Sequence, residues 1–207
     1  MALGLMSETG GGNGDILPII KFDAKAGDFI KVDRAQNASG EWEKNQSEMA
    51  LPIQIVMDFD NIETGWLSFD SGAPDFRMVK IGEAMPAKPS ENFKQAFRVR
   101  IYNKDLGLRE FSSQSKLVIK EMDGLHNQFE AERGNNAGKV PVVTVSGTKT
   151  VTVNTPQGEG RFKVPEWSVT SWIDRPAGMD GAETATPVEA PSAPVQSAPV
   201  ESGSDLF

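Results

Sequence analysis

The sequence contains no cysteine. This absence excludes disulfide bonds, zinc sites with thiolate ligands, iron–sulfur clusters and cysteine nucleophiles. No apolar run approaches the roughly 20 residues that a membrane-spanning helix needs. Residues 1–15 lack the basic region and the apolar stretch of a secretory signal peptide. We therefore expect a cytoplasmic protein with no membrane anchor.

Groups that carry enzyme chemistry are scarce. The only histidine, His126, lies in a segment with helical periodicity and has no nucleophile at a suggestive spacing, so we interpret it as a solvated helix residue. The acidic cluster of Asp58, Asp60 and Glu63 lacks the ligand pattern of a calcium loop, and a metal-dependent hydrolase built on it is the weakest hypothesis. These residues predict neither a catalytic triad nor a metal site.

Charge is distributed unevenly along the chain. The formal net charge is -8, which by itself argues against a nucleic-acid partner. Residues 176–207 carry five acids and no lysine or arginine, so residues 1–175 account for only -3. Within that body, residues 77–120 hold ten lysines and arginines against four acids. An acidic tail therefore follows a body with a basic central segment.

Short runs of alternating apolar and polar residues, separated by Gly, Pro, Asn and Asp, predict β-strands through most of the body. The polar segment 38–48, which contains Trp42, is expected to be a loop. Residues 140–156 are expected to form a strand, a turn and a second strand, and residues 160–176 a strand pair or a bent strand. The other expected strands lie within 16–23, 28–34, 51–59, 65–70, 76–82 and 93–104.

Residues 112–135 change to a helical period. Ser112 or Ser113 is the candidate N-cap and Gly134 the candidate stop. Gly124 lowers helix stability by ~1 kcal/mol relative to alanine and is a candidate break. The apolar residues at helical spacing are Leu117, Val118, Met122, Leu125 and Phe129.

These elements predict a mainly β protein with one inserted helix, built as an elaborated OB-fold-like antiparallel barrel. We expect a flexible N-terminal arm over 1–15, the domain over 16–175 and a disordered acidic tail over 176–207. Trp167 and Trp172 are five residues apart and would face opposite sides of an unbroken strand. A bulge between them would remove that difference.

The strand expected over 93–104 has two unlike faces. One is apolar and includes Phe97, whereas the other carries Arg98, Arg100 and Tyr102. Single-stranded nucleic acid is bound by cations that follow the phosphates and by rings that stack on bases, although an ordinary solvated face has the same pattern. The candidate DNA-binding residues are Arg98, Arg100, Tyr102, Lys80, Lys94, Lys104, Trp66 and Trp42.

The chain ends in "SGSDLF", so two apolar residues follow a long polar stretch rich in Pro and Ala. This ending resembles the C-terminal tip of bacterial-type single-stranded DNA-binding proteins, although consecutive acids are missing and Leu206 stands where that family has Pro. Body and tail together, including "SVTSWIDRPAG" at 168–178, are more similar to the single-stranded DNA-binding proteins of bacteriophages, which pair an elaborated OB-fold with an acidic tail.

The resemblance implies a non-catalytic protein without a cofactor that protects single-stranded DNA during phage replication or recombination. It also implies that Asp205, Leu206 and Phe207 dock on other replication or recombination proteins. A homo-oligomer is compatible with it. The alternative is a β-rich phage structural or interaction protein with a solubilising tail. In that case Arg98 and Arg100 would be solvated or paired with acids such as Glu110.

Overall fold

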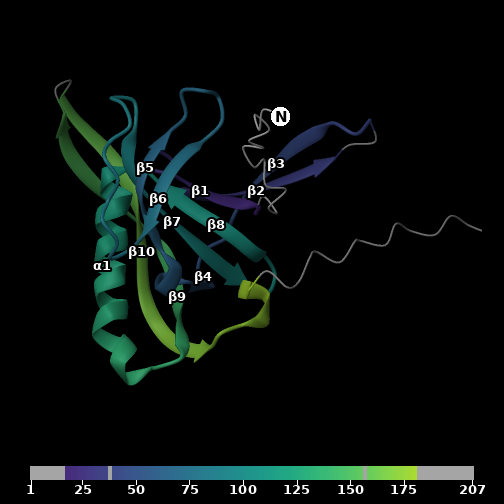
Figure 1. Ribbon diagram of the computed structural model, residues 1–207, viewed down its shortest axis with the longest axis vertical. Coiled ribbons are helices and arrows are strands. Elements are labelled where there is room, and N and C mark those ends of the chain that lie inside the picture. Colours follow the sequence, from purple (N-terminus) through teal and green to yellow (C-terminus); the bar gives the residue numbers. More distant parts are fainter. Residues whose placement is uncertain (1–16, 37–38, 156–157, 181–207) are drawn as a thin grey trace, which may run out of the picture.

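The computed structural model describes residues 17–36, 39–155 and 158–180 (Figure 1). This part of the chain is mainly β with one α-helix, as the sequence predicted. The helix α1 spans Lys116–Glu132, and short 3-10 turns lie at Phe59–Asn61 (η1), Arg133–Asn135 (η2) and Ala177–Asp180 (η3). The strands are β1 (Ile19–Asp23), β2 (Asp28–Gln36), β3 (Trp42–Glu48), β4 (Ile53–Met57), β5 (Glu63–Ser68), β6 (Asp75–Lys80), β7 (Lys94–Asn103), β8 (Gly107–Ser113), β9 (Lys139–Thr155) and β10 (Gly158–Asp174).

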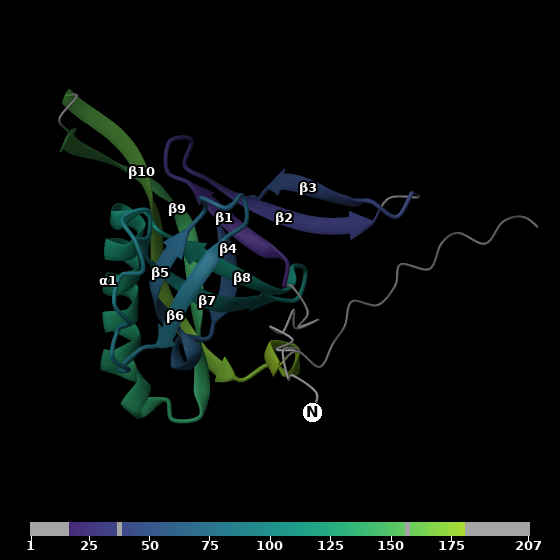
Figure 2. The same cartoon turned by 45° about the horizontal axis from the view of Figure 1, so that its top comes forward.

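All ten strands belong to one sheet in the order β10-β9-β4-β7-β8-β1-β2-β3, and β5 pairs with both β6 and β7. Every pair is antiparallel except β1 with β8. The sheet bends until distant strands meet: the Lys163 N–H in β10 donates to the Ala24 carbonyl after β1, at 2.7 Å. The Phe29 and Trp167 rings also approach to 6.5 Å. The result is an open, barrel-like sheet, consistent with an OB-type fold (Figures 1 and 2).

The helix α1 packs across β10 and β7 and buries one stripe of side chains. That stripe contains Val118, Met122, Leu125 and Phe129, which confirms the predicted helical spacing. They share one core cluster with Phe97, Val99 and Ile101, the apolar face of β7. Burial of the apolar stripe of α1 against the sheet is the main contribution to the stability of the helix.

The helix begins later than expected and is not broken. Its N-cap is Ser115, because Ser112 and Ser113 still pair with β7 as part of β8. Gly124 lies inside the continuous helix, on its exposed side, where tertiary packing of the opposite stripe outweighs its low helix propensity.

The prediction of a loop over 38–48 is wrong, because Trp42–Glu48 form β3, which pairs with β2. The described side chains of this strand, 43–48, are all exposed, so it has no buried face and no apolar alternation to reveal it. The strand β8 was also not expected as a separate element.

The expected turn within 140–156 is likewise wrong. Gly147 pairs with Glu166 and Val145 pairs with Trp167, so Ser146 is an extra residue in a continuous β9. This is a bulge, and the Ser146 hydroxyl bonds the Glu166 carbonyl at 3.1 Å. Segment 160–176 is correspondingly one bent strand, β10.

A second irregularity lies between Val169 and Ser171, and it places both tryptophans of β10 on the side of α1. The indole N–H of Trp167 donates to the Glu121 carbonyl at 3.1 Å, and that of Trp172 donates to Glu132 Oε2 at 2.9 Å. The bulge that the sequence left open therefore exists, and both rings contribute to the core.

Candidate nucleic-acid interface

The candidate interface is the outer face of β7, which we define as the face opposite α1 that carries Lys94, Arg98, Arg100 and Tyr102. Strand alternation separates these residues from the buried Phe97 series. Neighbouring strands extend the same face, because residues in register on adjacent strands point to the same side.

Arg98 is neutralised by carboxylates from two neighbouring strands. Its Nη2 lies 2.5 Å from Oε2 of Glu63 in β5, and its Nη1 lies 3.8 Å from Oε2 of Glu110 in β8. The guanidinium also lies over the Phe76 ring, 5.0 Å from the centroid, and the side chain is only 31% exposed. This is the arrangement that the structural-protein alternative predicts for Arg98.

Glu63, Arg98, Arg100 and Glu110 form a charged row on the outer face, in which Glu110 is in register with Arg100 and contacts Arg98. Burial raises the pKa of Glu110, Arg98 and Arg100 act to lower it, and the nearby Glu63 adds to the rise. The carboxyl group of Glu110 therefore takes up a proton more readily than an exposed glutamate does.

Arg100 is the exposed arginine of the outer face. It lies in register with Glu110, but among the described residues no carboxylate lies within 4.0 Å of its guanidinium. Its backbone is fixed, because the Asp58 N–H donates to the Arg100 carbonyl at 3.0 Å. Arg100 thus combines a rigid strand position with a side chain that is available to an anion.

Tyr102 is covered by the chain itself. Val56, Val142 and Met179 form a small apolar cluster against it, and Met179 has no exposed surface. A Cβ at Gly178 would lie 2.6 Å from Cε2 of Tyr102, so the backbone of η3 passes directly over the ring. One side of this expected stacking ring is therefore already occupied.

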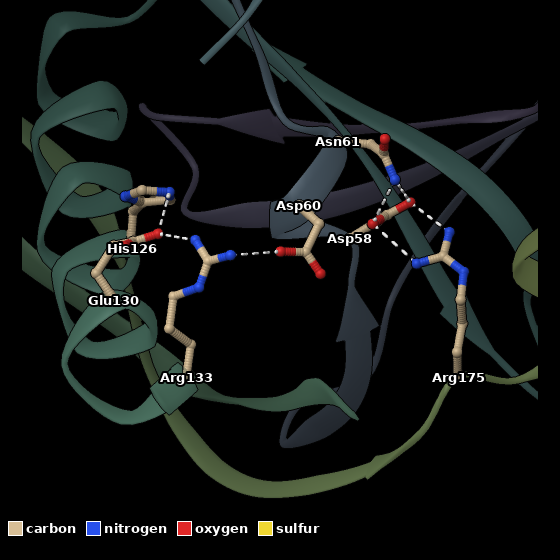
Figure 3. A network of polar contacts seen from close by, with 7 residues as sticks. All are labelled: Asp58, Asp60, Asn61, His126, Glu130, Arg133 and Arg175. Carbon is tan, nitrogen blue, oxygen red and sulfur yellow. Dashed lines mark hydrogen bonds and ion pairs between the residues drawn. The ribbon is translucent and has the colours of Figure 1, made fainter. Parts of the chain in front are cut away.

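The segment that covers Tyr102 is anchored by Arg175 (Figure 3). Its guanidinium donates two hydrogen bonds to Asp58, at 3.0 and 2.6 Å, and one to Asp180 at 2.8 Å. Asp58 has no exposed surface and also accepts from Asn61 at 3.0 Å. We call residues 175–180 the C-terminal latch. The described structure extends to Asp180, and the expected domain ended at residue 175.

The electrostatics of the latch follow from these contacts. Burial acts to raise the pKa of Asp58, but hydrogen bonds from Arg175 and Asn61 and the charges of Arg175 and Arg100 lower it overall. The hydrogen bonds to Asp58 and Asp180, and the charges of these two carboxylates, raise the pKa of Arg175. Asp58, which the sequence placed in an acidic loop, is therefore a buried ion-pair partner.

The predicted lysines lie at the borders of the outer face. Lys94 is exposed at the start of β7 and Lys104 is exposed in the turn after it. Lys80 pairs in register with Glu63 and donates from Nζ to Asn61 Oδ1 at 3.2 Å. Lys94 and Lys104 therefore lie toward the two ends of β7, whereas Lys80 lies beside Arg98, on the far side of β5.

The predicted tryptophans do not join this face. Trp66 pairs with Gln95, on the α1 side of β7, and its indole N–H donates to the Pro86 carbonyl at 2.8 Å. Lys88 covers the Trp66 ring at 5.8 Å. The backbone of Trp42 begins β3, and its side chain lies outside the described residues, as do Asp205, Leu206 and Phe207.

His126 is not the solvated residue that its position predicted. Its side chain is 16% exposed, and its ring meets Phe59 edge-on at 5.6 Å. Burial lowers the pKa of His126, and Glu130, 3.8 Å from Nε2, acts to raise it. No nucleophile is among the contacts of this imidazole in the described structure, and Figure 3 shows it beside Glu130 and Arg133.

Sequence reasoning named Glu110 as a possible partner of Arg98 but missed Glu63. Glu63 was assigned to an acidic loop, and its pairing with Arg98 depends on β5 adding to β7 across 35 residues of chain. The sequence could indicate this ion pair only by an acidic residue in register with Arg98 on the neighbouring strand. Finding that residue requires knowing which strand is the neighbour.

Other candidate features are weak. A surface depression of about 330 Å³ between α1 and the β9 bulge is lined by Glu121, Lys149 and Glu166, and Lys149 pairs with Glu121 at 3.0 Å. Within the described ranges, no three histidine or carboxylate side chains are arranged to hold a metal ion. The one α-helix there is too short and too polar to cross a membrane.

Comparison of the chain with protein-family models, curated proteins and solved structures found no match.

Proposed function

We propose that this protein binds single-stranded DNA without sequence preference and without catalysis, and protects it during phage replication or recombination in the cytoplasm of a bacterial host. The observation that carries the proposal is Arg100, an exposed cation on a rigid strand with no carboxylate within ion-pair distance in the described structure. The barrel-like sheet and the basic central segment support the same function.

The spacing of the exposed cations suits a polyanion. Lys94 and Arg100 lie six residues apart on one face of β7, which corresponds to about 20 Å along a strand. Lys104 continues the row in the next turn, and Lys80 flanks it. A backbone of several nucleotides could follow such a row, in line with the ~4–16 nucleotides that single OB-folds cover.

Arg98 has a different role in this proposal. Because Arg98 pairs with Glu63 and Glu110, it fixes the positions of these two carboxylates and adds little net positive charge to the outer face. Binding then depends on a few exposed cations, so we expect modest affinity that falls steeply with salt.

Partner recruitment is the second part of the proposed function. We propose that Asp205, Leu206 and Phe207 dock on replication or recombination proteins, a role that is supported by the resemblance of the tail. A short apolar anchor on a polar linker gives a weak and selective contact.

A β-rich interaction protein is the second candidate function. The ion pairs of Arg98 and the covered ring of Tyr102 favour it, because both remove groups that DNA would use. For this candidate, the charged row stabilises the sheet and binds no DNA.

The test is a titration of fluorescently labelled poly-dT with the full chain at low and moderate salt, monitored by fluorescence anisotropy and by mobility shift. We expect association that weakens steeply as salt rises. Arg100→Ala should weaken binding, whereas Lys120→Ala, which removes the same charge from the exposed side of α1, should not. Absence of any association at low salt would reject DNA binding and favour the interaction protein.

A further inference from the structure

The hairpin of β2 and β3 extends away from the body of the protein (Figures 1 and 2). In the described part of the chain, β3 pairs only with β2, and the side chains from Lys44 to Glu48 are all exposed. A two-stranded ribbon is marginally stable by itself, and the free edge of a strand is a template for another strand. The free edge of β3 is therefore a candidate contact surface.

The register shows which backbone groups of β3 are available. The Met49 N–H donates to the Phe29 carbonyl at 2.8 Å, and the pairing continues with Lys31 opposite Ser47 and Asp33 opposite Asn45. In an antiparallel pair, hydrogen-bonded positions alternate. The odd-numbered residues of β3 therefore bond to β2, and the N–H and C=O groups of residues 44, 46 and 48 point to the free edge.

These outward groups restrict how two copies of β3 could pair. In an antiparallel pair of two β3 strands, each residue with outward groups (44, 46 or 48) must lie opposite another residue of this set. The two-fold axis of such a pair therefore passes through a residue and not between two residues. An axis at Gln46 sets Lys44 opposite Glu48 twice and Asn45 opposite Ser47 twice. The segment "KNQSE" is thus self-complementary in charge about its centre.

We infer that a second copy of this chain is the occupant of the β3 edge, and that two protomers pair antiparallel through β3 about an axis at Gln46. The two sheets then become continuous across the dimer. An axis at Asn45 satisfies the same hydrogen-bond parity but sets Lys44 opposite Gln46 and forms no ion pair. The charge pattern therefore selects the register centred on Gln46.

The size of the contact indicates a weak dimer. Five residues of paired strand bury less than the ~1,200 Å² that stable interfaces need, so we expect a dissociation constant in the micromolar range. The inference does not depend on DNA binding, and its test uses the protein without DNA.

The experiment is sedimentation equilibrium of the full chain from micromolar to near-millimolar concentration. We expect the mass to rise from 22.4 kDa toward twice that value. Lys44→Glu and Glu48→Lys should each weaken the dimer about tenfold, because each sets like charges opposite one another twice. The double variant K44E/E48K should restore the wild-type dissociation constant.

Gln46→Pro gives the strongest expected loss. Its N–H points to the free edge, so proline removes a contact between protomers and no bond to β2, and we expect a monomer at all concentrations. Thermal unfolding that matches the wild type would show that the variant is folded. In hydrogen exchange, the amides of residues 44, 46 and 48 should gain protection with concentration, whereas those of Asn45 and Ser47 should not change.

Three results would overturn the inference. The first is a wild-type chain that stays monomeric up to near-millimolar concentration, which would leave the edge to a different protein. The second is a Gln46→Pro variant that dimerises as tightly as the wild type. The third is a double variant K44E/E48K whose dimer dissociation constant is as high as that of either single variant.

Discussion

The outer face of β7 has two halves that differ in what covers them. The half with Lys94, Arg98 and Arg100 is polar and open to solvent at Arg100, whereas the half with Tyr102 lies under the C-terminal latch. The same strand alternation produces both halves. The difference arises from segments far away in sequence: Glu63 balances Arg98, and Arg175 holds the latch over Tyr102. Whether a residue of this strand face is exposed or covered therefore depends on the segments that pack beside it.

The largest expected effect comes from opening the covered half. Arg175→Ala leaves the buried Asp58 carboxylate without its charged partner, and we expect a loss of about 3 kcal/mol in the free energy of unfolding. Urea denaturation of the variant and the wild type measures it.

Arg133→Ala is the matched control for this prediction. Arg133 pairs with Asp60, in the 3-10 turn that Asp58 caps, at 3.4 Å, but both side chains are about half exposed (Figure 3). Its loss should cost less than about 1 kcal/mol. Equal effects of the two variants would contradict the role of burial in the latch.

A smaller change is expected from crowding the latch against Tyr102. Gly178→Ala places a methyl group against the ring, and we expect a loss of about 1–2 kcal/mol in thermal unfolding. In a Tyr102→Ala background the same substitution should cost almost nothing, because the contact has been removed. Additive effects of the two substitutions would show that η3 does not pack on this ring.

The open half is tested by its two arginines. Arg100→Ala should weaken poly-dT binding about fivefold and reduce the salt dependence by the ~0.7 that one phosphate contact on a single strand contributes. Arg98→Ala should instead lower stability, because Glu63 and Glu110 lose their shared partner. Fluorescence titration and urea denaturation of both variants measure the difference, and the reverse outcome would exchange the two proposed roles.

The smallest expected effect is a difference in pH dependence between the halves. The pKa of Asp58 is lowered from 3.8, so the stability that Asp58 contributes is present at neutral pH and is lost as pH falls below that value. The pKa of Glu110 is raised from 4.5, so the folded state binds its proton more tightly than the unfolded state. The contribution of Glu110 therefore falls as pH rises through 4.5 and above.

Glu110→Gln tests this difference through urea denaturation between pH 4 and 7. Relative to the wild type, the variant should gain stability as pH rises over this range. Asp58→Asn should lose stability relative to the wild type as pH rises from about 2 to 5, the range in which the contribution of Asp58 appears. An advantage of Glu110→Gln that does not change with pH would contradict the raised pKa.

Much of the core was predictable because its pattern is local. Phe97, Val99 and Ile101 alternate along one strand, and Val118 and Met122 recur at the helical period, so their burial follows from periodicity. The strand β3 could not be found in this way, since its described side chains, 43–48, are all exposed.

The candidate site was only partly predictable. Alternation correctly placed Arg98 and Arg100 on the face opposite Phe97, but Trp66 was grouped with them although it lies on the α1 side. Which strand lies beside β7, and in which register, depends on contacts between distant segments, and a shift of one residue reverses every side chain.

The sequence by itself determined a mainly β body, one amphipathic helix and a strand with one apolar and one cationic face, because each depends on the period of nearby residues. Only the tertiary structure decided that Arg98 is neutralised, that Arg100 is exposed and that the latch covers Tyr102. Glu63, Asp58 and Arg175 reach β7 from other elements, and their positions follow from strand order and from the bulges of β9 and β10. Those features arise from the packing of the whole sheet and leave no periodic signal in the chain.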